Sequence, residues 1–158
     1  MNRSWTGDDG VTWTAADART DQTLNGKAIC WGTSGTRNVI SPSYSGGMGT
    51  LTFNYVRAFT GTKPRSLEVY VNGNQIGSTI TVSPTSDIVV QYSNPINVSG
   101  NVVLEIRSTG SAQVKVDDVA WTSYSGSNPT IGVSPPILTG FSYEYNTGPS
   151  TAQSFSLT

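Results

Sequence analysis

The sequence predicts an all-β protein, an antiparallel β-sandwich, and three observations support this. Short runs of alternating apolar and polar residues recur along the chain, each bounded by Ser, Pro, Gly or Asn. No stretch shows the apolar period of roughly 3.6 residues that marks an amphipathic helix. Charged residues make up 12% of the 158 residues, which suits strands joined by turns better than long surface helices.

The first predicted strands lie before residue 60. The runs KAICW (27–31) and TRNVI (36–40) flank a turn-like GTSG. The longest run, GTLTFNYVRAF (49–59), places Leu51, Phe53 and Tyr55 at alternate positions, with Thr52 and Asn54 on the other face. This is the period of a half-buried strand, whose successive side chains point to opposite faces.

The remaining strands follow at similar spacing. SLEVYV (66–71) and QIGSTITV (75–82) are joined by Asn-Gly-Asn, a hairpin turn signal. DIVVQY (87–92), NVVLEI (101–106) and AQVKV (112–116) come next, each between turn residues. In total we expect about nine short strands, as in a β-sandwich.

Composition excludes several classes of function. The net charge of −1 gives no electrostatic case for a nucleic-acid partner, and no apolar run is long enough for membrane insertion. The chain contains no His, so a Ser-His-Asp triad, a Cys-His pair and His-ligated zinc are impossible within it. The single Cys30 rules out an internal disulfide. Paired-carboxylate catalysis and calcium binding stay open.

Composition changes near SYSGSNP (123–129). Only one of the charged residues, Glu144, lies after Asp118. We therefore expect a β-sandwich module over 1–127. Residues 128–158 are then either a linker and the start of a second domain cut short, or extra strands docked on the sandwich, because so few residues cannot easily build another β core.

Three segments carry a resemblance to a known family. From WTGDDGVTWTAADART through SGGMGTLTFNYVRAFTGTKPRSLEVYVNGNQIG to VKVDDVAWTSYS, the sequence resembles jelly-roll carbohydrate-binding modules of secreted bacterial multidomain enzymes. The tail SPPILTGFSYEYNTGPSTAQSFSLT resembles the first strands of an immunoglobulin-like repeat from such enzymes. The resemblance implies a jelly-roll sandwich, a secreted or cell-surface location and a covalently linked catalytic domain. It does not name the polysaccharide.

Two adjacent aspartates interrupt the run QVKVDDVAW. The resemblance implies a structural calcium held by Asp117 or Asp118 with Asp8 and Asp9 of the N-terminal segment. The alternative is a β-bulge in which an aspartate bonds to nearby backbone or to Arg19.

Catalysis by the same two aspartates is a sharper hypothesis. Neighbours on one strand point apart, so each would need a facing partner such as Glu68 or Glu105. We therefore expect the module not to be an enzyme.

Exposed aromatic rings and Arg side chains are the candidate ligand contacts. Sugar rings stack on aromatic faces, and Arg binds carboxylate or sulfate groups in a bidentate manner. The predicted ligand-binding residues are Tyr70, Tyr44, Arg57, Arg65 and Arg107. If the Arg residues share a face, the partner is an acidic or sulfated polysaccharide; otherwise they only solvate the sheet.

The four tryptophans have two interpretations. Trp13, Trp31 and Trp121 lie in apolar strand patterns, which favours core packing, and Trp5 favours a plug over one end of the sandwich. The alternative for each is a stacking platform for sugar.

The predicted function is that of a non-catalytic carbohydrate-binding module. It would hold a secreted polysaccharide-degrading enzyme at its substrate and so raise the local enzyme concentration. The alternative is a structural spacer or protein-interaction module without a glycan ligand. A small carboxylate-based enzyme is the third class.

Overall fold

A computed structural model of the chain describes residues 2–8, 10, 12–19 and 21–126, together with 133–134, 143–145, 148–149, 154 and 156–157. The chain divides into two compact units, Met1–Ser125 and Gly126–Thr158. No helix among the described residues is long and apolar enough to cross a membrane.

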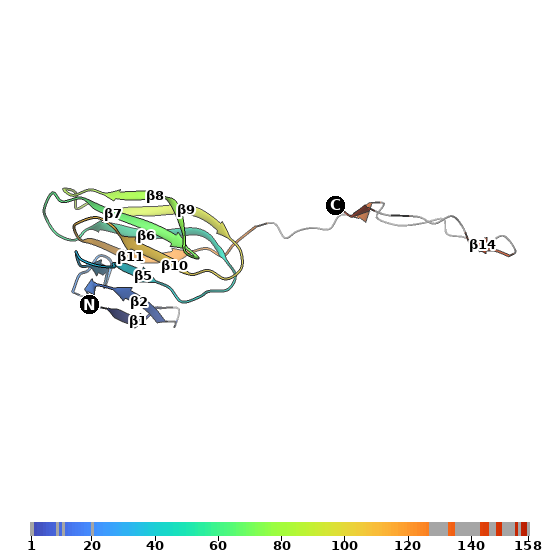
Figure 1. Cartoon of the computed structure of the whole chain (residues 1–158), viewed down its shortest axis with the longest axis horizontal. Coiled ribbons are helices and arrows are strands. Elements are labelled where there is room, and N and C mark those ends of the chain that lie inside the picture. Colours follow the sequence, from blue (N-terminus) through green and yellow to red (C-terminus); the bar gives the residue numbers. More distant parts are fainter. Residues whose placement is uncertain are drawn as a thin grey trace. The chain divides into compact units, whose positions relative to one another are not determined.

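Two antiparallel sheets form the first unit (Figure 1). The six-stranded sheet contains, in spatial order, β1 (Arg3–Thr6), β2 (Thr12–Ala16), β5 (Asn38–Ile40), β10 (Leu104–Ser108), β7 (Arg65–Val71) and β8 (Asn74–Val82). The five-stranded sheet contains β3 (Ala18–Arg19), β4 (Ile29–Trp31), β11 (Val114–Trp121), β6 (Met48–Arg57) and β9 (Val90–Val98). The predicted antiparallel β-sandwich is therefore confirmed.

The core lies between the two sheets and follows the alternation of the strands. In β7 and β10, buried and half-buried residues alternate at every position. Leu67 and Ile106 are fully buried from the six-stranded sheet, and Trp31 and Phe53 from the five-stranded sheet. Burying one such side chain contributes about 1.5–3 kcal/mol, so these inward rows hold the two sheets together.

Of the about nine strands expected, the eight runs named by residue all form strands, with shifted ends. The run predicted at 87–92 becomes a strand only at Val90 and continues to Val98, although Pro95 lies within it. Proline lacks an N–H donor, and β9 tolerates it because β9 is the outer strand of its sheet. The run predicted at 112–116 continues past the two aspartates to Trp121.

The sequence pattern missed three N-terminal strands. In β1, only Trp5 is strongly apolar, and β3 has two residues. β2 does alternate, because Trp13 and Ala15 are buried, but its small and polar residues gave a weak signal.

The second unit contains two short strand pairs. They are β12 (Val133–Ser134) with β15 (Ser156–Leu157), and β13 (Tyr143–Glu144) with β14 (Gly148–Pro149). The start of an immunoglobulin-like repeat over 128–158 stays a prediction.

Candidate functional site: a groove beside Trp5

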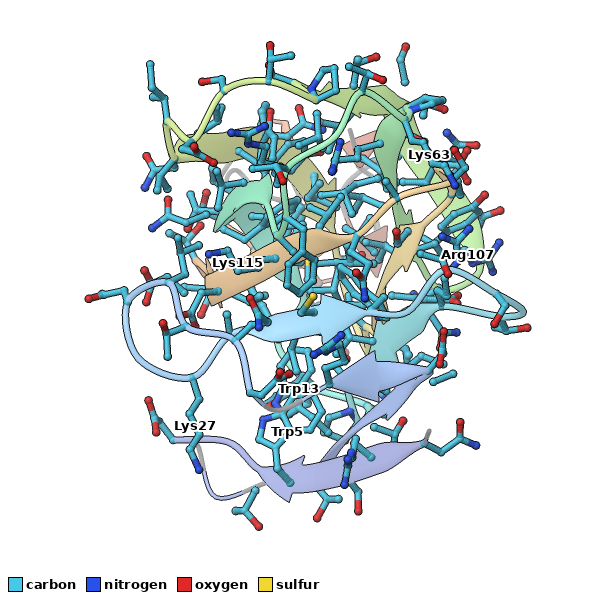
Figure 2. The ribbon with its side chains drawn as sticks, turned by 90° about the vertical axis from the view of Figure 1, so that its left-hand side faces the viewer. Trp5, Trp13, Lys27, Lys63, Arg107 and Lys115 are labelled. Atoms are coloured by element: carbon cyan, nitrogen blue, oxygen red, sulfur yellow. The ribbon has the colours of Figure 1, made fainter. Side chains whose placement is uncertain are left out.

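Two tryptophans face each other where the sandwich is open at its edge. Trp5 on β1 and Trp13 on β2 are directly opposite in register, and their rings lie 6.4 Å apart at an angle of 19° (Figure 2). Trp13 is only 8% exposed and belongs to the core. Trp5 is only partly buried, because β1 is the outer strand of its sheet.

The aromatic row continues into the other sheet. The Trp13 ring lies 6.2 Å from Trp121 on β11, and the Tyr44 ring meets Trp121 edge-on at 4.9 Å. Such tilted and edge-to-face contacts stabilise aromatic pairs beyond the area they bury. Tyr44, a predicted ligand contact, is thus packed against this row and is half-buried.

Two adjoining hollows open beside Trp5, and both are also lined by Lys27 and Ile29. The first, the acidic hollow, has a volume of about 300 Å³ and is further lined by Gly7, Asp8, Trp13, Val116, Asp117, Asp118 and Val119. The second, the basic hollow, has a volume of about 310 Å³ and is further lined by Arg3, Ser4, Ala18, Arg19 and Ala28. We call the two together the Trp5 groove.

A β-bulge places the two aspartates at this groove. The register of β11 against β6 shifts between Asp117 and Ala120, and Asp118 has a left-handed backbone with φ of 53°. A bulge turns the strand locally, so neither carboxylate enters the core: Asp117 is half-buried and Asp118 is exposed. Of the two interpretations of this pair, the structure shows the bulge.

The aspartates bond to nearby backbone and to Asn side chains, and not to Arg19. Asp117 accepts hydrogen bonds from the backbone N–H groups of Asn25 (3.0 Å) and Asp118 (3.0 Å). Asp118 accepts from the side-chain amides of Asn54 (2.9 Å) and Asn25 (3.3 Å). Arg19, the predicted partner, is instead paired with Asp21 at 2.6 Å. This ion pair holds the pKa of Asp21 at about 2.

The predicted calcium site has no acidic cluster among the described residues. No group of three or more Asp, Glu, Cys or His side chains is close enough to hold a metal ion in the part of the chain that the structure describes. Both oxygens of Asp117 already accept N–H bonds. Asp8 lines the acidic hollow, and Asp9 lies outside the described residues.

The predicted pair Tyr70 and Arg107 meets on the outer face of the six-stranded sheet. The Arg107 guanidinium lies 3.7 Å from the centre of the Tyr70 ring. Arg107 also binds Glu105 through two hydrogen bonds of 2.9 Å, and the Tyr70 hydroxyl donates to Glu68 at 2.8 Å. Asn38 completes the network by donating to Glu105 at 2.6 Å.

Each group of this network is compensated by a neighbour. The hydrogen bond from Arg107 lowers the pKa of Glu105, and the bond to Glu68 raises the pKa of Tyr70. The guanidinium covers the ring face that a sugar would stack on. The side chains of this network are thus occupied with one another on the outer face of the sheet.

The structure places the Arg57 and Arg65 side chains largely out of solvent and outside the Trp5 groove. Arg65 is 3% exposed, and its guanidinium donates to the carbonyl oxygens of Phe59, Gly61, Lys63 and Gln113. This role is structural, so we leave Arg65 out of the candidate site.

The Arg57 side chain is 10% exposed and binds Asp87 at 2.6 and 2.7 Å. It also donates to the carbonyl oxygen of Pro84 at 2.8 Å, so it fastens the loop before β9 to β6. Arg57 is also left out of the candidate site.

Sequence reasoning missed the groove itself. The sequence pattern favours Trp5 as a plug over one end of the sandwich, and no motif marks Lys27. One signal was present: Trp5 and Trp13 flank the turn-like TGDDG segment, so a hairpin there places the two indoles side by side.

Solved structures share this architecture. A family 35 carbohydrate-binding module from Paenibacillus barcinonensis is 18% identical with a TM-score of 0.52, over 78% of this chain and 98% of that one. A family 36 module in complex with calcium and xylotriose is 10% identical with a TM-score of 0.52, over 77% and 99%. The cleaved K3 adhesin domain of Lys-gingipain from Porphyromonas gingivalis is 16% identical with a TM-score of 0.53, over 77% and 91%.

No family model and no curated protein matches the sequence. At these low sequence identities, the similarity to the solved structures is a similarity of fold. The chain has the jelly-roll β-sandwich seen in carbohydrate-binding modules, and the fold implied by the sequence resemblance is confirmed.

Proposed function

We propose that this chain is a non-catalytic carbohydrate-binding module and that the Trp5 groove is its binding site. One observation carries the proposal: a partly exposed indole stands between two hollows lined by carboxylates, an ammonium and guanidinium groups. Pockets that bind small molecules combine apolar or aromatic walls with a few convergent polar groups in this way.

The groove offers both kinds of contact that a sugar needs. The Trp5 indole provides a flat apolar surface for the C–H face of a sugar ring, and Trp13 stacks behind it and keeps it in place. In the acidic hollow, Asp8 and Asp118 accept hydrogen bonds from hydroxyl groups, while Lys27 donates them. An open groove buries little of a polysaccharide, so we expect micromolar to millimolar affinity.

The proposal includes the setting of the module. The solved carbohydrate-binding modules share its fold, and the sequence resembles modules of secreted bacterial enzymes. Here the module is secreted or displayed at the cell surface and keeps a covalently linked hydrolase at its polysaccharide, which raises the effective concentration of the enzyme. A structural calcium remains a separate hypothesis, tested by chelation.

The second candidate is a spacer or protein-interaction module. The adhesin domain of Lys-gingipain has the same fold, which shows that the architecture also occurs outside the named carbohydrate-binding modules. A spacer would bind no glycan in the Trp5 groove. The two candidates therefore differ in whether glycan binding exists and is lost when Trp5 is removed.

A retention experiment tests the proposal. Affinity gels with plant, algal, fungal and microbial polysaccharides should retard the wild-type protein on at least one of them. Trp5→Ala should abolish the retardation, because the stacking platform is gone. Tyr124→Ala removes an exposed ring (38%) that lines neither hollow, and it should behave as wild type. If no polysaccharide retards the protein, the spacer is the better reading.

A further inference from the structure

We propose that the basic hollow of the Trp5 groove accepts the carboxylate or sulfate of an anionic sugar, while the acidic hollow takes a neutral neighbouring residue. The ligand is then a glycan in which charged and neutral residues alternate. This inference rests on the proposed function and specifies the ligand class of the same site.

The charged residues that line the basic hollow are all cationic. Arg3, Arg19 and Lys27 line it, and no Asp or Glu is among its described lining residues. Arg19 is neutralised by Asp21, which it binds through two hydrogen bonds of 2.9 and 2.6 Å. Arg3 and Lys27 form no ion pair within the described part of the chain. Two cations without an ion-pair partner among the described residues therefore line this hollow, and Lys27 shares its other side with the acidic hollow.

The backbone positions these cations beside the indole. Arg3 lies two residues before Trp5 on β1, and its Nε donates to the carbonyl oxygen of Ala18 on β3 at 3.5 Å. This weak contact directs the guanidinium across the gap between the two sheets. Ala18 and Ala28 are each 3% exposed, so small apolar side chains form the floor of the hollow.

An anionic sugar satisfies both features of the hollow. Its ring stacks on Trp5, and its carboxylate or sulfate receives charge-assisted hydrogen bonds from Arg3 and Lys27, which are about twice as strong as neutral ones. Planar guanidinium is especially suited to bind such oxyanions. A neutral sugar would leave the two cations without partners.

The acidic hollow, which Trp5 also lines, favours a neutral sugar. Asp8, Asp117 and Asp118 line it, and their carboxylates repel a second anionic group. They accept hydrogen bonds from hydroxyls instead. Trp5 and Lys27 line both hollows, so the charge of the lining residues changes from positive to negative at these two side chains. Neighbouring sugars on one chain can therefore have different charges.

Matched polysaccharides test the inference. Agarose is a neutral galactan, κ-carrageenan is a related galactan in which sulfated and neutral residues alternate, hyaluronan alternates uronate with a neutral amino sugar, and polygalacturonate is charged at every residue. We expect retention on κ-carrageenan or hyaluronan to exceed that on agarose and polygalacturonate. Which of the two is preferred distinguishes sulfate from carboxylate.

Two variants separate the hollows. Arg3→Gln should weaken binding to the preferred alternating glycan about tenfold, the usual effect of losing a hydrogen bond to a charged group, and should flatten its salt dependence. Asp8→Asn changes the acidic hollow only, so binding should stay at least as sensitive to salt as in the wild type. Lys63→Gln, a change at an exposed cation outside both hollows, serves as the control.

The outcomes distinguish this inference from the proposed function. If a neutral glycan binds equally well and depends on Trp5, while Arg3→Gln changes nothing, the groove binds sugar but the charge requirement is wrong. The same holds if polygalacturonate binds best. If none of these polymers nor the wider panel is retained, both proposals fail. Melting curves of each variant confirm that any loss of binding is not a loss of fold.

Discussion

Trp5 and Trp13 form a directly opposed cross-strand pair, yet only Trp13 belongs to the core. Both rings project from the same side of the β1–β2 hairpin and lie 6.4 Å apart. Trp13 reaches Trp121 of the opposite sheet, whereas Trp5 stands on the outermost strand, where fewer residues cover it. Both rings line the acidic hollow, but only Trp13 is also part of the core, whereas Trp5 lines both hollows.

The two tryptophans should respond differently to truncation. Trp13→Ala removes a buried ring and should lower the free energy of unfolding by about 3–5 kcal/mol. Trp5→Ala should cost clearly less, because the ring is only partly buried, but should abolish glycan retention. Urea unfolding and affinity gels on the same preparations measure both. Equal destabilisation by the two changes would show that Trp5 is a core residue.

Chelation tests the calcium hypothesis. Because Asp117 and Asp118 are satisfied by N–H donors, we expect the melting temperature to be the same with EDTA and with added calcium. A ligand that binds only the folded state raises the melting temperature, so a required ion would be evident. A drop under EDTA that calcium reverses would instead place an ion beside the N-terminal acids.

Glu105 should make stability depend on acid pH. Its pKa lies below the ordinary value of 4.5, because Arg107 and Asn38 donate hydrogen bonds to its ionised form. A carboxyl group whose pKa is lower in the folded than in the unfolded state stabilises the fold at any pH above its unfolded-state pKa. For Glu105 this stabilisation is therefore lost as the pH falls below about 4.5. Glu105→Gln should be less stable than wild type at pH 7, and the difference should shrink towards pH 3. Melting curves that stay equally far apart at every pH would contradict this assignment.

Arg65 should be far more important for stability than Arg107. Arg65→Met takes the Arg65 donor from the carbonyl oxygens of Phe59, Gly61 and Lys63, while that of Gln113 keeps the N–H of Ala58, and each lost bond costs about 1–3 kcal/mol when the group stays buried. We expect a loss of at least about 3 kcal/mol in urea unfolding. The matched change Arg107→Met removes a side chain that is 40% exposed and paired with Glu105, and it should cost about 1 kcal/mol or less.

The boundary of the module can be tested by truncation. A chain ending at Ser127 should unfold cooperatively, because the first compact unit ends at Ser125. A chain ending at Trp121 should be less stable, since Thr122 accepts hydrogen bonds from Gly49 and Thr50 at the start of β6. If the chain ending at Ser127 loses its cooperative transition, residues after it are part of the core.

The sequence by itself determined the strands and their inward faces. Side-chain direction in a strand alternates with every residue, so the pattern of β7 shows locally that Leu67 and Val69 point inward and Tyr70 outward. The same parity points Arg65 inward, and it was the available signal that this residue is no surface ligand contact. The absence of His was equally decisive, because it removes whole classes of chemistry.

Only the tertiary structure decided which residues share the groove. Trp5, Lys27 and Asp118 are far apart in the sequence, and they meet because β1, the segment before β4 and the bulge of β11 come together at the open edge of the sandwich. No local period encodes how the outer strands of two sheets approach each other. That approach depends on the packing of the whole core, and it determines that Trp5 is left beside two hollows of opposite charge.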